Sequence, residues 1–152
     1  MSRVFSARHA AQPLILFVEP MAHIRNRVAV AMKLTNMRLL AVENGKTALD
    51  IVQRVEMPTL AVIELALPDM KGVEVARRLY RYRPLPIIMT GYLPDPSAIV
   101  VMLDQIAEDF VQKPYDAREL VARMLRLLPM NYRASLDTDA FVKGSLQEMS
   151  MQ

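Results

Sequence analysis

The feature that most constrains the fold is an apolar run that ends in an acid. Residues 60–63 are all apolar and lead directly into Glu64, while Leu67-Pro68-Asp69 and Gly72 break the pattern shortly afterwards. An uninterrupted apolar run bounded by Pro and Gly indicates a central strand that is buried on both faces of a parallel sheet. Open α/β sheets place their ligands and chemistry outside the carboxyl ends of such strands. Glu64 is therefore the first candidate site residue.

Similar apolar runs recur along the chain. In the segments between them, apolar residues recur at helical spacing. Pro20 suits the first turn of a helix, and Asp116 with Glu119 has the spacing of a capping box. The predicted strands are 14–18, 38–42, 60–65, 87–90 and 110–112, and the predicted helices are 21–37, 46–55, about 73–79, 97–106 and 116–128.

Five strands that alternate with five helices predict a doubly wound α/β fold with a parallel sheet and helices on both faces. Of the two common strand orders, the shorter one, 2-1-3-4-5, fits this chain. In that order Glu19 and Glu64 face each other across the point where the chain reverses direction. Thr90 and Lys113 follow the fourth and fifth strands and reach the same rim. We therefore expect one crevice to hold two acids, a hydroxyl and an ammonium group.

Length and composition limit the remaining possibilities. The 152 residues accommodate an amino-terminal arm (1–12), one domain (13–128) and a tail (129–152) that is too short for a DNA-binding effector domain. The absence of Cys fits a reducing compartment, so a cytoplasmic location is expected. The net charge of +3 is mild and predicts no nucleic-acid binding. No apolar stretch is long enough for a membrane span.

Four motifs in order resemble a known family. Glu64 with Pro68 and Gly72, then Thr90-Gly91, then Lys113-Pro114, match the receiver domain of two-component response regulators over residues 13–128. The resemblance implies the flavodoxin-like fold of CheY-like proteins and a sensor histidine kinase as partner. It also implies a cis peptide bond at Lys113-Pro114.

The family's site residues map onto this chain with two substitutions. In the family, an acid pair after the first strand binds Mg²⁺ together with an aspartate after the third strand, and that aspartate accepts the phosphoryl group. Glu19-Pro20 occupies the position of the acid pair, and Glu64 that of the phosphoacceptor. The switch and phosphate-contacting positions are matched by Thr90, Phe110 and Lys113, and we expect Phe110 to be buried.

The two substitutions affect metal binding and phosphoryl transfer. Pro20 offers no side-chain oxygen to Mg²⁺, and Glu64 carries its carboxylate about 1.5 Å farther out than Asp would. Because phosphoryl transfer depends on positioning, we expect an atypical pseudo-receiver that is not phosphorylated in the ordinary way and holds no metal. The longer Glu64 side chain is expected to approach Lys113 and Thr90 directly. Two alternatives stay open: a strand-end acid that merely pairs with a base, and a working phosphoacceptor in a phosphorelay.

A contact surface is predicted on the fourth and fifth helices. Ile99, Met102, Leu103 and Ile106 are expected to face inward, which leaves Val100 and Val101 exposed. The fifth helix has a broad apolar stripe that includes Leu125. Exposed apolar residues often mark contact sites, so homodimerisation through this face is expected, with a helix buried under the tail as the alternative. The tail itself is compatible with extending the contact or with disorder.

Other classes of function are disfavoured. A flavin-binding protein would need Gly, Ser or Thr with free N–H groups after the first strand, where this chain has Glu19-Pro20-Met21. A hydrolase would need a nucleophile, a base and a group that orients the base, and no such set is recognisable. We therefore expect neither a cofactor nor an enzymatic activity.

Overall fold

The computed structural model describes residues 12–92 and 95–133, together with the short stretches 143–144, 146–147 and 149–150. Its strands are β1 (Leu14–Val18), β2 (Arg38–Val42), β3 (Leu60–Glu64), β4 (Ile87–Gly91) and β5 (Asp109–Gln112). Its helices are α1 (Ala22–Met32), α2 (Gly45–Arg54), α3 (Gly72–Tyr82), α4 (Pro96–Gln105), α5 (Ala117–Leu127) and the short α6 (Met130–Arg133).

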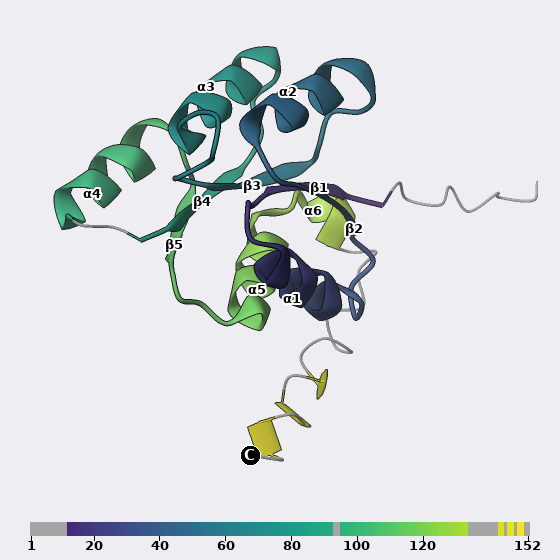
Figure 1. Cartoon of the computed structure of the whole chain (residues 1–152). Coiled ribbons are helices and arrows are strands. Elements are labelled where there is room, and N and C mark those ends of the chain that lie inside the picture. The colour runs from purple at the N-terminus through teal and green to yellow at the C-terminus, as the bar shows by residue number, and fades with distance from the viewer. Residues whose placement is uncertain (1–11, 93–94, 134–142, 145, 148, 151–152) are drawn as a thin grey trace, which may run out of the picture.

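The strands form one parallel sheet in the order β2-β1-β3-β4-β5, which confirms the predicted fold and strand order. Helices α2, α3 and α4 cover one face of the sheet, and α1 and α5 cover the other (Figure 1). Because all strands run the same way, the carboxyl ends of β1, β3, β4 and β5 lie along one edge. This arrangement brings residues far apart in the sequence to a common rim.

The burial of the strands explains their positions. Every residue of β1, β3 and β4 is buried, whereas β2 and β5, at the two edges, are only partly so. Successive side chains of a strand point to opposite faces, so each central strand supplies two cores. Ile15, Phe17 and Val62 pack against α1 and α5, while Leu16 and Ile63 pack against α2 and α3. The central strands therefore need continuous apolar runs, because each of them is buried on both faces of the sheet.

Helix α1 differs from the prediction at both ends. Pro20 lies before the N-cap residue Met21 rather than in the first turn, and the helix ends at Met32 instead of 37. The early end has a local cause, because the Thr35 hydroxyl donates a hydrogen bond of 2.7 Å to the Met32 carbonyl in the turn that follows.

The predicted capping box at α5 is only half present. Asp116 caps the helix, and its carboxylate accepts a hydrogen bond of 2.8 Å from the Arg118 N–H. Glu119 forms an ion pair of 3.0 Å with Arg123 instead of reaching back to the cap. Arg123 also binds Asp109 at 2.9 Å, so it ties α5 to β5.

Fewer side chains of helix α4 are buried than expected. Val100 and Val101 are exposed as predicted, but Leu103, which was expected to face inward, is 42% exposed. Met102 is the buried residue of this helix. Phe110 on the edge strand β5 is only half-buried, because this sparsely packed helix is what covers its face of the sheet. The expectation that Phe110 is buried was therefore only partly right.

The predicted arm, apart from Gln12, lies outside the described residues, as does tail segment 134–142. The described part of the tail begins with α6, where Tyr132 packs against the α1 and α5 core. Across the described residues, no helix combines the length and the apolar character that crossing a membrane requires.

Candidate functional site

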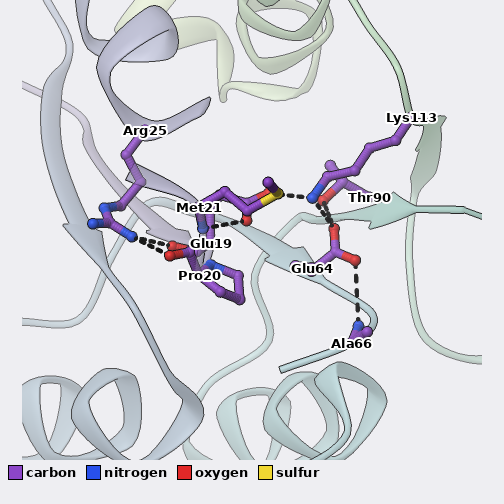
Figure 2. A network of polar contacts seen from close by, with 8 residues as sticks. All are labelled: Glu19, Pro20, Met21, Arg25, Glu64, Ala66, Thr90 and Lys113. Atoms are coloured by element: carbon purple, nitrogen blue, oxygen red, sulfur yellow. Dashed lines mark hydrogen bonds and ion pairs between the residues drawn. The ribbon is translucent and has the colours of Figure 1, made fainter. Parts of the chain in front are cut away.

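Four polar side chains from four different strand ends meet at the carboxyl edge of the sheet (Figure 2). Glu19 follows β1, Glu64 ends β3, Thr90 lies in β4 and Lys113 follows β5. All four residues are at most 5% exposed. The strand order predicts this meeting point, and the structure brings the four side chains together there.

Lys113 is the centre of the cluster. Its Nζ lies 2.5 Å from Glu19 Oε1 and 2.9 Å from Glu64 Oε2. The Thr90 hydroxyl donates a hydrogen bond of 3.2 Å to Glu64 Oε2. Burial alone would lower the pKa of Lys113. The hydrogen bonds that its ammonium donates to Glu19 and Glu64, together with their negative charges, outweigh this effect and raise that pKa above its ordinary value. The lysine is therefore a buried ammonium ion shared by two carboxylates.

Two glycines leave space around Glu64, Gly91 beside its side chain and Gly72 beside its backbone. Gly91 has a φ of 151°, which L-residues rarely adopt, and a Cβ there would lie 3.2 Å from Glu64 Oε1. A Cβ on Gly72 would lie 2.0 Å from the carbonyl oxygen of Glu64, so α3 can begin this close to β3 only without a side chain. The remaining Glu64 oxygen, Oε1, accepts a long hydrogen bond of 3.4 Å from the Ala66 N–H.

The loop between β1 and α1 is held by the backbone and by Arg25. Glu19 Oε2 accepts a hydrogen bond of 3.0 Å from the Met21 N–H. Arg25 Nη1 donates to the carbonyl oxygens of Glu19 at 2.7 Å and Pro20 at 2.8 Å (Figure 2). Sequence reasoning missed Arg25, and its position one turn into the predicted helix was the only available signal. Pro20 supplies a carbonyl oxygen to this loop and no side-chain oxygen to the cleft.

Tyr115 was also missed. Its hydroxyl is buried and has no hydrogen-bond partner among the described residues. Burial, followed by the charges of Glu19 and Glu64, raises its pKa far above the ordinary value. It lies just after the cis peptide bond Lys113-Pro114, which the structure contains as predicted. Tyr115 lines a cavity of about 130 Å³ together with Lys113 and the first turns of α1.

The residues predicted for a partner surface lie on two different helices and differ in exposure. Val100 and Val101 are exposed on α4, 67% and 54% respectively. Leu125 is half-buried on α5, where it packs against the core formed with α1. The residues of the proposed dimer face thus belong to helices on opposite sides of the sheet (Figure 1).

A family model for the response regulator receiver domain matches residues 15–125, which is most of the chain. The chain belongs to the response regulator receiver family. This receiver domain is 34% identical over 134 residues to the transcriptional regulatory protein AfsQ1 of Streptomyces coelicolor, an alignment that covers 88% of this chain and 58% of that protein. It is also 34% identical over 117 residues to the phosphate regulon transcriptional regulatory protein PhoB of Pseudomonas aeruginosa, covering 75% of this chain and 51% of that protein.

The receiver domain therefore spans little more than half the length of these two relatives. Solved structures agree on the fold. A CheY-like receiver domain protein from Methanospirillum hungatei superposes with a TM-score of 0.69 at 21% identity, covering 76% of this chain and 93% of that one. The BeF3-activated DrrB receiver domain superposes with a TM-score of 0.67 at 24% identity, covering 76% and 97%.

Proposed function

We propose that this receiver domain is a signalling module that acts by binding a histidine kinase or another signalling protein, without needing phosphorylation. In this proposal Glu64 stands where the family carries its phosphoacceptor aspartate. Its contacts with Lys113 and Thr90 hold the site in one arrangement that needs neither a phosphoryl group nor Mg²⁺. The domain then has no catalytic activity of its own.

The observation that carries the proposal is the position of Lys113 between Glu19 and Glu64. One carboxylate oxygen of Glu64 already contacts both the Lys113 ammonium and the Thr90 hydroxyl, the two groups that would otherwise contact a phosphoryl group. A carboxylate has fewer acceptor oxygens and less charge than a phosphoryl group, but it can accept hydrogen bonds from the same lysine and hydroxyl. For a phosphoryl group to bind in this place, Glu64 would have to give up both contacts within a buried site.

The donor set does not fit Mg²⁺. This ion requires octahedral oxygen ligation at short distances, in which carboxylates supply part of the shell. Glu19 and Glu64 each have an oxygen directed at the Lys113 ammonium, and Pro20 brings no carboxylate. Among the described residues, no group of three or more His, Cys, Asp or Glu side chains could hold a metal ion.

Several further properties belong to the same proposal. We expect the module to work in the cytoplasm, where a chain without Cys is at no disadvantage, and to bind no nucleic acid through residues 13–128. Homodimerisation through the α4 surface is supported by the exposure of Val100 and Val101. The relatives named above are transcriptional regulators, which makes a signalling role the natural reading of the shared receiver domain.

The decisive experiment is phosphorylation in vitro. Purified protein is incubated with acetyl phosphate and Mg²⁺, and its intact mass is measured. The wild-type chain should gain no phosphoryl adduct. The double variant Pro20→Asp, Glu64→Asp should gain one, because it restores a metal ligand and shortens the acceptor by about 1.5 Å, a displacement that can change a rate about a hundredfold.

Two controls make the result specific. Glu64→Gln should not become phosphorylated, since an amide cannot accept the group, and circular dichroism should show that every variant keeps its fold. A stoichiometric adduct on the wild-type chain would overturn the proposal. It would favour the alternative, a working phosphoacceptor that takes part in a phosphorelay.

A further inference from the structure

The outer surface of helix α3 is basic. Residues 71–83, which contain this helix, carry five basic residues and one acidic residue, a net charge of +4. The acidic residue is paired with an arginine on the same helix. Arg77, Arg81 and Arg83 are exposed, and none of them forms an ion pair with another described residue. Three cations on this stretch of the chain are therefore available to a partner.

The neighbouring helix α4 does not balance this charge. Asp104 is the only charged residue in the sequence of α4. The acids that flank the helix are engaged elsewhere, because Asp95 caps α4, Glu108 accepts a hydrogen bond from the first N–H of β4, and Asp109 is paired with an arginine of α5. The surface that α3 and α4 form together is consequently net basic.

A groove of about 240 Å³ runs between the two helices, which lie side by side on one face of the sheet (Figure 1). It is lined by residues of α3 and of the end of α4, namely Ala76, Arg77, Tyr80, Arg81, Gln105 and Ile106. Pockets for small molecules usually have volumes of about 300–1,000 Å³, so this groove is smaller than a typical ligand site. Its size suits one or two side chains of a larger partner.

Exposed apolar side chains lie in and beside this groove. Tyr80 lines its α3 side and is 51% exposed, and Val101 on α4 is 54% exposed. Val101 precedes the groove residue Gln105 by about one helical turn, so the two residues share one side of α4. The surface thus combines apolar area at the groove with cations along its α3 flank.

We propose that the α3–α4 surface binds an amphipathic helix of a partner signalling protein, in which Asp or Glu residues flank one side of an apolar stripe. The stripe lies on Tyr80 and Val101 and inserts a side chain into the groove, the usual way in which amphipathic helices bind grooves. The acids of the partner face Arg77 and Arg81. The proposal rests on the proposed function, because it names the chemistry of that function's partner. A copy that binds such a helix cannot use Val101 for the α4 homodimer at the same time.

A protein helix suits this surface better than a nucleic acid does. Nucleic-acid contacts rely on cations that follow the phosphate backbone and on aromatic rings that stack with bases. Here the cations lie on the α3 side alone, while the exposed part of α4 offers the aliphatic Val100 and Val101 and the acid Asp104. Aliphatic area beside charge is what a protein contact uses.

Fluorescence anisotropy with a synthetic peptide tests the proposal. The probe is a fluorescein-labelled peptide of about 20 residues built from Leu, Glu, Gln and Ala, with Leu at helical spacing and Glu beside the Leu stripe. It should bind the full wild-type chain with a dissociation constant below about 1 mM. Binding should weaken when sodium chloride is raised from about 0.05 M to about 0.5 M, because surface charges are screened. A peptide of the same composition in scrambled order should not bind.

Variants of the chain locate the contact. The Arg77→Glu, Arg81→Glu double variant should raise the dissociation constant about tenfold or more, and Tyr80→Ser about fivefold, because charge complementarity and an aromatic anchor are lost. The Arg27→Glu, Arg126→Glu double variant makes the same charge change at exposed sites on α1 and α5, which cover the other face of the sheet, and should leave binding unchanged. All the substituted residues are exposed, and circular dichroism checks that each variant keeps its fold.

Three results would overturn the proposal: no binding of the peptide by the wild-type chain, binding that survives reversal of Arg77 and Arg81, or binding that is lost in the α1 and α5 variant instead. Binding of a fluorescent single-stranded oligonucleotide that depends on the same two arginines, by a chain that does not bind the peptide, would assign the surface to nucleic acid.

The outcome is independent of the phosphorylation experiment. A chain that binds no peptide and also takes up no phosphoryl group would remove this surface and leave the proposed phosphorylation-independent role standing. A chain that binds the peptide as described but is phosphorylated would keep the surface and remove that role.

Discussion

At the scale of single residues, Lys113 is the side chain on which the site depends. Moving charges into a protein interior is costly, and the attraction between them compensates only when geometry is good and the remaining groups are bonded. Lys113 meets this condition with two carboxylates within 2.9 Å. Removing it would leave two buried acids facing each other with no cation between them.

Lys113→Met should therefore destabilise the domain by about 3–5 kcal/mol, the cost typical of breaking a buried ion pair by deleting one partner. Urea unfolding followed by circular dichroism measures this. Lys46→Met, at an exposed lysine on α2, should change the free energy of unfolding by no more than about 0.5 kcal/mol. Equal effects from the two changes would contradict the account of the site.

The same ion pairs determine how stability depends on pH. The folded-state pKa of Lys113 is raised above the ordinary value of 10.5, so its stabilisation is fully present below pH 10.5 and is lost as pH rises through the folded pKa. Wild-type protein should consequently lose more stability than Lys113→Met at alkaline pH. Comparing the two proteins removes the contribution of other groups that titrate there.

At the scale of elements, the loop after β3 stabilises the start of α2. Asp69 follows the central strand, and its carboxylate accepts hydrogen bonds from the Gly45 N–H at 3.0 Å and the Lys46 N–H at 2.8 Å. These are N–H groups of the first helical turn, which have no partner within the helix. Slight burial would raise the pKa of Asp69, but the backbone hydrogen bonds outweigh it and lower that pKa.

Asp69→Ala should cost about 1 kcal/mol of stability, as the loss of a capping side chain generally does. Because the folded pKa of Asp69 is lowered, this stabilisation is present above pH 3.8 and is lost as pH falls through the folded value. Urea titrations at neutral and acidic pH check both statements.

Asp50→Ala is a suitable comparison. Asp50 lies on the same helix, and its carboxylate has no hydrogen bond or ion pair with any described residue. A loss of stability as large as that of Asp69→Ala would mean that the cap is not the cause.

At the scale of the whole molecule, the sheet separates two cores. One is formed with α1 and α5 and includes Ile15, and the other is formed with α2, α3 and α4 and includes Ile63. Both residues are fully buried, and no side chain belongs to both clusters. The cores should therefore respond independently to small changes.

Ile15→Val and Ile63→Val should each cost about 0.5–1.5 kcal/mol, since each removes one buried methylene group. The double variant should equal their sum within about 0.5 kcal/mol, because distant sites without shared partners are additive. Chemical denaturation of the three variants measures this. A clear departure from additivity would show that the two faces are mechanically coupled through the sheet.

The sequence alone was sufficient for the architecture and for the four strand-end residues that meet at the site, although Arg25 and Tyr115 were missed. Apolar runs such as 60–63 are typical of strands buried on both faces of a parallel sheet, and the parallel direction then places Glu19, Glu64, Thr90 and Lys113 at one edge. The features that it predicted wrongly are those decided by competition between local partners. Glu119 forms an ion pair with Arg123 instead of a capping box, and α1 ends early at a turn hydrogen bond.

Only the tertiary structure decided how much of each surface is covered and which partner each charge takes. Leu103 has an inward helical spacing, yet it is exposed because α4 lies at the β5 edge, where little of the sheet remains to cover it. Sequence reasoning likewise predicts that Glu64 approaches Lys113, as the structure confirms, but not that Glu19 lies at bonding distance from the same ammonium group. That arrangement depends on the packing of several strand ends at once, which no local pattern records.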